Sequence, residues 1–289
     1  MSPYLKGFLI TLSGVFVISP DVLLIRLIDA QTFTQLFWRG MLSGSAILLF
    51  YLAATRRDFV PQLCALGWPG LWIVAVFTTG TFCFLYSATH TLAANTLFIS
   101  STTPAFAALI SVVFLSEKVT VRTWTAIVVS LGGIAIIASG SFARTGGSLA
   151  GDLAALGAAV SMAAVFSIAR ANKTASMVPA MGLAGLATGF VAMLVAPTLA
   201  VPADDILWVA LLGLAVVPAG FGLLTTGPRY LPAPDVRLLL LLESLLGPLL
   251  VWLVLAESPG SRTITGGAVV LGAMVFSNLP ALSNATRKS

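Results

Sequence analysis

The chain has 289 residues, of which 58% are hydrophobic and only 9% are charged. Soluble domains carry roughly 25% charged residues, so this composition excludes a soluble globular enzyme, and its high hydrophobicity excludes a disordered chain. The formal net charge is +5, but no basic tract or recognition motif accompanies it, and we expect no nucleic-acid partner. The composition predicts an all-α integral membrane protein with the lipid bilayer as its surroundings.

The predicted elements are membrane-spanning helices. A helix that crosses about 30 Å of hydrocarbon needs roughly 20 apolar residues. The first run follows an N-terminus without a signal-peptide cleavage site, so we expect it to stay uncleaved. Ten such runs with short connections follow one another, at 5–25, 32–54, 68–89, 93–115, 121–140, 150–170, 178–199, 206–228, 235–256 and 263–282.

The placement of Lys and Arg predicts the orientation of these spans. With the N-terminus inside, only Arg26, Arg144 and Arg262 lie outside, and Arg39 lies within a span. We therefore expect cytoplasmic N- and C-termini. The eleven cytoplasmic residues are Lys6, Arg56, Arg57, Lys118, Arg122, Arg170, Lys173, Arg229, Arg237, Arg287 and Lys288.

The second half of the chain repeats the first. Residues 109–132 and 249–272 share nine identical residues without a gap, including Glu117 with Glu257 and Arg122 with Arg262. A shift of 144 residues also matches Arg26 to Arg170. We expect two five-helix repeats, 1–145 and 146–289. Because five is odd, the second repeat is inverted, which is typical of alternating-access transporters; some channels also share it.

Several stretches carry a family pattern: Leu36–Gly40, Asn95–Pro104, Phe114–Glu117, Leu131–Gly133, Leu242–Pro248 and Ala256–Glu257. They resemble the EamA-type branch of the drug/metabolite transporter superfamily, and the likeness covers nearly the whole chain. Ser244 departs from the family, which often has Pro after the matching Glu. Within the branch the chain is similar to exporters of aromatic amino acids, which implies efflux of Phe, Tyr and Trp from a bacterial cytoplasm.

Charged residues inside the bilayer are costly and are therefore candidates for the transport site. Glu243 lies within the ninth run and precedes Pro248, which is expected to break the helix near Ser244. Its carboxylate would bind a substrate ammonium or carry a proton, or else form a structural ion pair. Arg39 would meet a substrate carboxylate or pair with Glu243 or another buried acceptor.

The fourth run carries a series of polar groups. We expect Asn95, Ser100 and Thr103 to bind substrate and Pro104 to break the helix near Ser100. This stretch corresponds to Glu243–Pro248 in the other repeat, and interrupted helices at corresponding positions indicate a transport site.

Aromatic side chains supply further candidates. Trp38, Tyr86, Phe166 and Trp252 would stack on an aromatic substrate, although packing or lipid contact explains each equally well. His90 follows Tyr86 by one turn, and its imidazole would titrate near neutral pH. We expect a gating or proton-coupling role for it, or a polar residue at the outer interface.

The chain lacks a Walker A sequence, an Asp-rich magnesium motif and metalloprotease spacing. We expect no enzyme, no cofactor and no metal. The sequence predicts an alternating-access exporter of amino acids, with its cavity between spans 1–4 and 6–9 and no need to form an oligomer. With no obvious carboxylate pair, a facilitator is as well supported as a proton antiporter. The alternatives are another metabolite or drug as substrate, or a channel or non-transporting scaffold.

Overall fold

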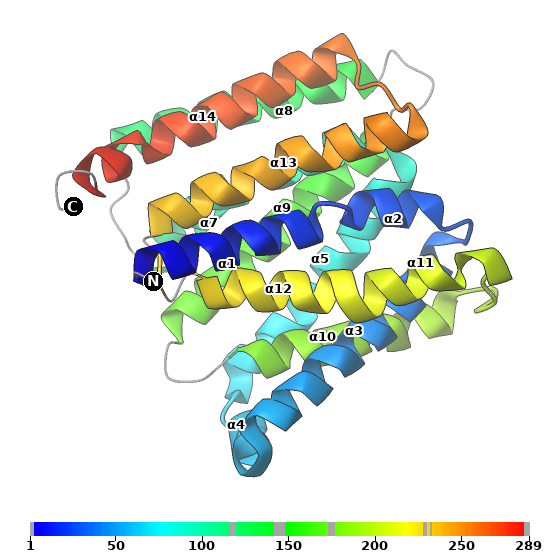
Figure 1. The fold of residues 1–289 in the computed structure, drawn as a ribbon. Coiled ribbons are helices and arrows are strands. Elements are labelled where there is room, and N and C mark those ends of the chain that lie inside the picture. Colours follow the sequence, from blue (N-terminus) through cyan, green and yellow to red (C-terminus); the bar gives the residue numbers. More distant parts are fainter. Residues whose placement is uncertain are drawn as a thin grey trace.

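The computed structural model describes residues 3–115, 120–141, 148–172, 177–227, 230–231 and 233–285. These ranges form a bundle of helices without a strand (Figure 1). The longer helices are α1 (Pro3–Ile18), α2 (Asp21–Leu27), α3 (Thr32–Thr55), α5 (Gly67–His90), α6 (Ala93–Ser100), α7 (Thr103–Leu115), α8 (Val121–Ser141), α9 (Leu149–Ala171), α10 (Val178–Val195), α12 (Val217–Thr226), α13 (Ala233–Leu255) and α14 (Ser261–Ala285). The shorter ones are η1 (Arg56–Asp58), α4 (Phe59–Cys64), η2 (Ala203–Asp205), α11 (Ile206–Ala210) and the π-helical turn η3 (Leu211–Val216).

These helices confirm the predicted fold class. Within the described residues, eight helical stretches are long and apolar enough to cross a membrane, and two shorter apolar helices lie at 239–255 and 261–277. Together they fall on the ten predicted runs. The first span consists of α1 and α2, the fourth of α6 and α7, and the eighth of α11, η3 and α12.

Helices of one half pack mainly against helices of the other half. The most extensive contacts join α3 to α10, α5 to α9 and α8 to α14, and α1 also packs along α12. Figure 1 shows α8 beside α14 along one edge of the bundle, and α3 crossing α10 at the opposite side. In the repeat, α3 corresponds to α10 and α8 to α14, so each of these two contacts joins equivalent helices. Because α5 corresponds to α12 and α9 to α1, the contact of α5 with α9 is equivalent to that of α12 with α1. This pattern is what two inverted repeats of five spans produce.

Glycines let the paired helices approach closely. A Cβ at Gly44 would lie 2.6 Å from the backbone nitrogen of Leu186 and 2.7 Å from the carbonyl oxygen of Gly182. In the other pair, a Cβ at Gly266 of α14 would lie 2.6 Å from the carbonyl oxygen of Gly133 in α8. The two halves therefore meet backbone to backbone.

The interrupted spans are the first and the fourth. Two residues, Ser19 and Pro20, separate α1 from α2, and Ser101 and Thr102 separate α6 from α7, just before Pro104. The expected break at Pro248 is wrong, because α13 continues through it as one helix.

Hydroxyl groups account for this difference. At the α6–α7 interruption, the hydroxyls of Ser101, Thr102 and Thr103 donate to the carbonyls of Phe98, Ile99 and Ser100 at 2.6–2.7 Å. In hydrocarbon, a broken helix needs such partners for its freed carbonyls. The corresponding stretch of α13 reads Leu-Leu-Glu-Ser, which offers a single hydroxyl. Proline alone does not end a helix there.

We expect Gly44→Ala to destabilise the protein, because the added methyl group would collide with the backbone of α10. Overpacking of this kind costs about 1–3 kcal/mol. Thermal unfolding in detergent should show a lower midpoint. Gly132→Ala is the matched control, since nothing lies within 4 Å of its added Cβ, and an equal midpoint for the two variants would contradict the tight α3–α10 contact.

Candidate functional site

A buried ion pair lies inside the bundle, between the second span and the interruption of the first. Arg39 of α3 donates from Nη2 to Oδ2 of Asp21, the first residue of α2, at 2.9 Å. Each side chain is only 8% exposed. The guanidinium also lies 5.5 Å from the ring centroid of Phe84 in α5, a distance at which cation–π attraction acts. The pair thus joins α2, α3 and α5.

Each partner of this pair keeps one atom without a hydrogen bond. Arg39 Nη1 and Asp21 Oδ1 are both buried and have no partner among the described residues. Buried polar atoms are satisfied in the great majority of cases, so an open donor and an open acceptor within one ion pair require an explanation.

Glu243 brings a second carboxyl group to this centre. It lies on α13, which packs against both α1 and α2, and it interacts electrostatically with Asp21. Gly247, one turn further along α13, packs against Leu97 and lies near the carbonyl oxygen of Ser19 at the first interruption. Folding therefore brings Asp21 and Glu243, 222 positions apart in the sequence, near enough for their charges to interact.

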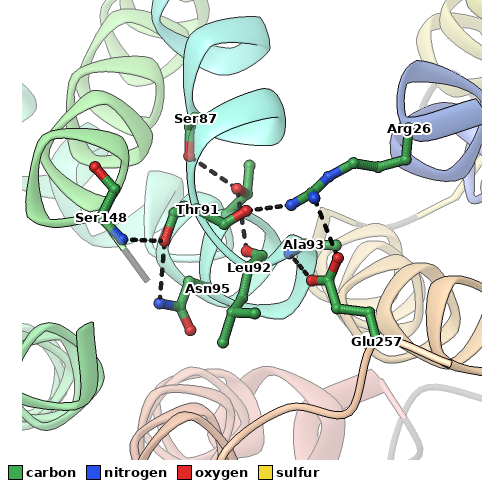
Figure 2. Close-up of polar contacts among 9 residues, drawn as sticks. Arg26, Ser87, Thr91, Leu92, Ala93, Asn95, Ser148 and Glu257 are labelled. Carbon is green, nitrogen blue, oxygen red and sulfur yellow. Dashed lines mark hydrogen bonds and ion pairs between the residues drawn. The ribbon is translucent and has the colours of Figure 1, made fainter. Parts of the chain in front are cut away.

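A second polar cluster closes one end of the bundle, the end opposite the two chain termini (Figures 1 and 2). We call it the distal network. Arg26 Nη1 lies 3.2 Å from Oε2 of Glu257, and its Nη2 donates to the carbonyl oxygen of Thr91. Oε1 of Glu257 accepts from the backbone nitrogen of Ala93 at 2.7 Å. Because Arg26 belongs to the first half and Glu257 to the second, this pair ties the halves together.

Asp152 forms the buried side of the distal network. Its carboxylate accepts from Thr91 Oγ1 at 2.8 Å, Asn95 Nδ2 at 3.0 Å and Ser141 Oγ at 2.5 Å. Asn95 Oδ1 in turn accepts from Thr263 Oγ1 at 2.8 Å. All five residues are buried. The connection between α5 and α6 and the helices α6, α8, α9 and α14 therefore meet around a single acidic side chain.

Three predicted polar residues of the fourth span lie in different surroundings. Asn95 belongs to the distal network, where its amide makes structural hydrogen bonds. Ser100 lies at the end of α6, and its Oγ is buried without a partner among the described residues. Thr103 Oγ1 donates to the carbonyl oxygen of Ser100 at 2.7 Å, so these two residues form part of the interruption itself.

Tyr86 and His90 lie on an exposed stripe of α5. Their rings stack at 4.0 Å, and His90 Nδ1 lies 2.9 Å from the carbonyl oxygen of Tyr86. Trp68, Trp72 and Thr79 continue the same exposed stripe at helical spacing. The opposite side of α5 packs against α9 and α10. By helical spacing, the stripe lies on the other side of α5 from Phe84, the residue next to Arg39.

The remaining predicted residues are also dispersed. Trp38 donates from Nε1 to the carbonyl oxygen of Leu199 at 2.8 Å, which fixes it beside the segment that follows α10. Trp252 is 49% exposed on a stripe of α13 with Leu245 and Leu249. Phe166 is 48% exposed on α9, whereas Ser244 is buried.

Asp21 is the residue that the sequence reasoning missed. It falls inside the first predicted run, and an acidic residue at membrane depth is a site candidate by itself. Ser19-Pro20-Asp21 also has the composition of a helix start. Both signals were present in the sequence, although neither indicates that Arg39 is the partner.

Within the described ranges, no three His, Cys, Asp or Glu side chains gather as a metal site would require. The polar groups of the centre are one guanidinium and two carboxyl groups. Such groups can bind a small charged molecule directly.

Comparison with known proteins places this geometry in a family. Residues 5–139 and 149–279 each match the EamA-like transporter family. The chain belongs to the EamA-like transporter family. It is therefore a multi-pass membrane transporter of small solutes, built from two copies of the family's repeat.

One solved structure, titled only as the crystal structure of a protein, resembles the chain with a TM-score of 0.65 and 20% sequence identity. The match covers 96% of this chain and 97% of the other, and at this identity it shows the shared fold alone. The comparison with curated proteins gives no match.

We expect Asp152→Ala to destabilise the protein strongly, because the hydroxyl and amide groups of Thr91, Asn95 and Ser141 lose their shared acceptor. The cost is roughly 1–3 kcal/mol for each donor left unpaired. Asp204→Ala, an exposed carboxylate in the segment before α11, is the matched control. Equal thermal midpoints for the two variants would show that the distal network contributes nothing to stability.

Proposed function

We propose that this transporter exports amino acids, aromatic ones first, across the bacterial inner membrane by alternating access. The observation that carries the proposal is the buried pair of Arg39 and Asp21 with one donor and one acceptor left open. Ionic groups at membrane depth are costly, and they typically mark substrate or ion pathways. The ring of Phe84 beside Arg39 supplies an apolar surface for an aromatic side chain.

The charge balance of the centre favours an amino acid over an anion. One guanidinium faces two carboxyl groups, Asp21 at 2.9 Å and Glu243 nearby. A purely anionic substrate, such as a nucleotide sugar, would meet more negative than positive charge there. An α-amino acid brings an ammonium group and a carboxylate, both of which find a partner.

We propose cytoplasmic termini, on the distribution of Lys and Arg. The distal network then lies at the outer side, where it holds the halves together. In alternating access this side must open when the substrate leaves. The tie between Arg26 and Glu257 crosses from one half to the other, so it is the contact that has to break.

We assign substrate binding to Arg39, Asp21 and Glu243, with Ser100 and Thr103 at the neighbouring interruption. Asp21 and Glu243 together provide a proton carrier, which favours antiport over a plain facilitator. The placement of Tyr86, His90 and Trp252 on exposed stripes supports lipid contact for these three residues.

Counterflow in proteoliposomes tests the proposed substrate. Vesicles loaded with unlabelled Phe are expected to accumulate external labelled Phe transiently, without any ion gradient, because a carrier exchanges the two pools. Other vesicles are loaded with Trp, Thr or Lys, and the uptake of labelled Phe that each one drives ranks the substrates. Arg39→Lys is expected to lose the exchange, since a single ammonium group cannot replace the planar guanidinium, whereas Arg122→Lys, on α8 and distant in sequence from the centre, should keep it. No counterflow with correctly inserted protein would contradict amino acid export.

Glu243→Gln separates exchange from proton coupling. The charged groups facing Glu243 are Asp21 from α2 and, behind it, Arg39 from α3. We expect the variant to retain counterflow, with weaker binding of Phe because one carboxylate near the ammonium group is lost, and to lose the response of uptake to an imposed pH gradient. His90→Gln should retain both properties because His90 lies on the exposed stripe of α5. Loss of the pH response in His90→Gln, and not in Glu243→Gln, would reverse this assignment.

A further inference from the structure

The two atoms left open in the Arg39–Asp21 pair belong to the two groups that form the ion pair. Nη2 and Oδ2 form the ion pair at 2.9 Å, and the free atoms, Nη1 and Oδ1, belong to the same two planar groups. Both are buried, so bulk water does not satisfy them in this conformation. The centre therefore offers one charged donor and one charged acceptor, from two side chains that touch each other.

A ligand that satisfies both atoms must carry the complementary pair. A carboxylate accepts from Nη1, and an ammonium group donates to Oδ1. An acid alone leaves Oδ1 open, and an amine alone leaves Nη1 open. A zwitterionic α-amino acid carries both groups on one carbon atom, and the Glu243 carboxyl adds negative charge near Asp21.

The helix α2 connects this centre to the distal network. Asp21 is its first residue, and Arg26 lies five residues later, about 7.5 Å along the axis. The interruption at Ser19 and Pro20 separates α2 from α1, and the chain becomes extended at Ile28. This short helix can therefore shift as a unit, and a change at Asp21 reaches the contact between Arg26 and Glu257.

We propose that Arg39 Nη1 and Asp21 Oδ1 bind the carboxylate and the ammonium group of a zwitterionic α-amino acid, and that α2 transmits this binding to the Arg26–Glu257 pair. The inference rests on the proposed export of amino acids and adds its recognition site and its link to the outer side. Asp21 acts as a binding residue, and Arg26 acts as the residue that holds the outer side closed.

The first experiment measures ligand binding by the purified full-length protein. Labelled Phe is displaced with unlabelled Phe, phenethylamine or 3-phenylpropionate, which share the aromatic side chain but differ in their charged groups. Each single-charge analogue is expected to bind at least about tenfold more weakly, since it loses one charge-assisted hydrogen bond. Asp21→Asn should narrow the preference for Phe over 3-phenylpropionate, a change in selectivity that loss of stability does not produce. Asp204→Asn is the matched control.

The second experiment reports on the outer side. Ala93 is buried beneath Glu257, so Ala93→Cys is introduced after Cys64 and Cys83 have been replaced by Ser. In the Ala93→Cys protein, labelling by a membrane-impermeant maleimide should rise severalfold on addition of Phe. When Arg26→Ala is added to Ala93→Cys, labelling should already be high without Phe. When Asp21→Asn is added to Ala93→Cys, Phe should no longer raise the labelling. Arg26→Ala should still raise the labelling when it is combined with Asp21→Asn. Ser261→Cys, exposed at the start of α14, controls for reagent access.

The outcomes separate the two proposals. If none of the amino acids in the counterflow panel binds or exchanges, amino acid export and the zwitterion site both fail. If Phe exchanges but phenethylamine or 3-phenylpropionate competes equally well, export stands and the site is overturned. If Phe binds with the expected selectivity but leaves the labelling of Ala93→Cys unchanged, the link through α2 is overturned. The ligand series with the unmodified protein decides the site even where Asp21→Asn does not fold.

Discussion

Hydrocarbon offers no hydrogen bonds, and the polar groups of this bundle are arranged around that constraint. The carboxylate of Asp152 collects three donors, the α6–α7 interruption is satisfied by its own hydroxyls, and Arg39 is balanced by Asp21. Where a group lacks a partner, as at Nη1 of Arg39 and Oδ1 of Asp21, the same constraint makes it conspicuous. In the Arg39–Asp21 pair, both charged partners keep such an open atom.

The two halves contribute unequally to this arrangement. Both interrupted spans, the first and the fourth, belong to the first repeat, while the corresponding α9 and α13 are continuous. The short helix α2 packs against α13 of the second half and α5 of the first. The two halves share the order of their spans, but divergence has placed both interruptions in one of them.

Much of the fold was predictable because it follows from composition and spacing. Apolar runs of membrane length predicted ten spans. The match of Glu117 to Glu257 and of Arg122 to Arg262, in the alignment of the two halves, indicated the repeat. The candidate site was predicted in part: Arg39 and Glu243 stand out because charge is rare in these spans. Pro248 misled the prediction, since a proline breaks a membrane helix only where neighbouring groups satisfy the freed carbonyls.

The sequence by itself determined that this protein spans the membrane, in ten helices and two similar halves, because those properties depend on hydrophobicity and on internal repetition. Only the tertiary structure decided which charges meet. Arg39 pairs with Asp21, Glu243 joins them from a distant part of the chain, and Arg26 reaches Glu257. It also decided that Tyr86 and His90 lie on an exposed stripe. Helical periodicity gives the residues of one face, but which face meets another helix depends on the packing of the whole bundle.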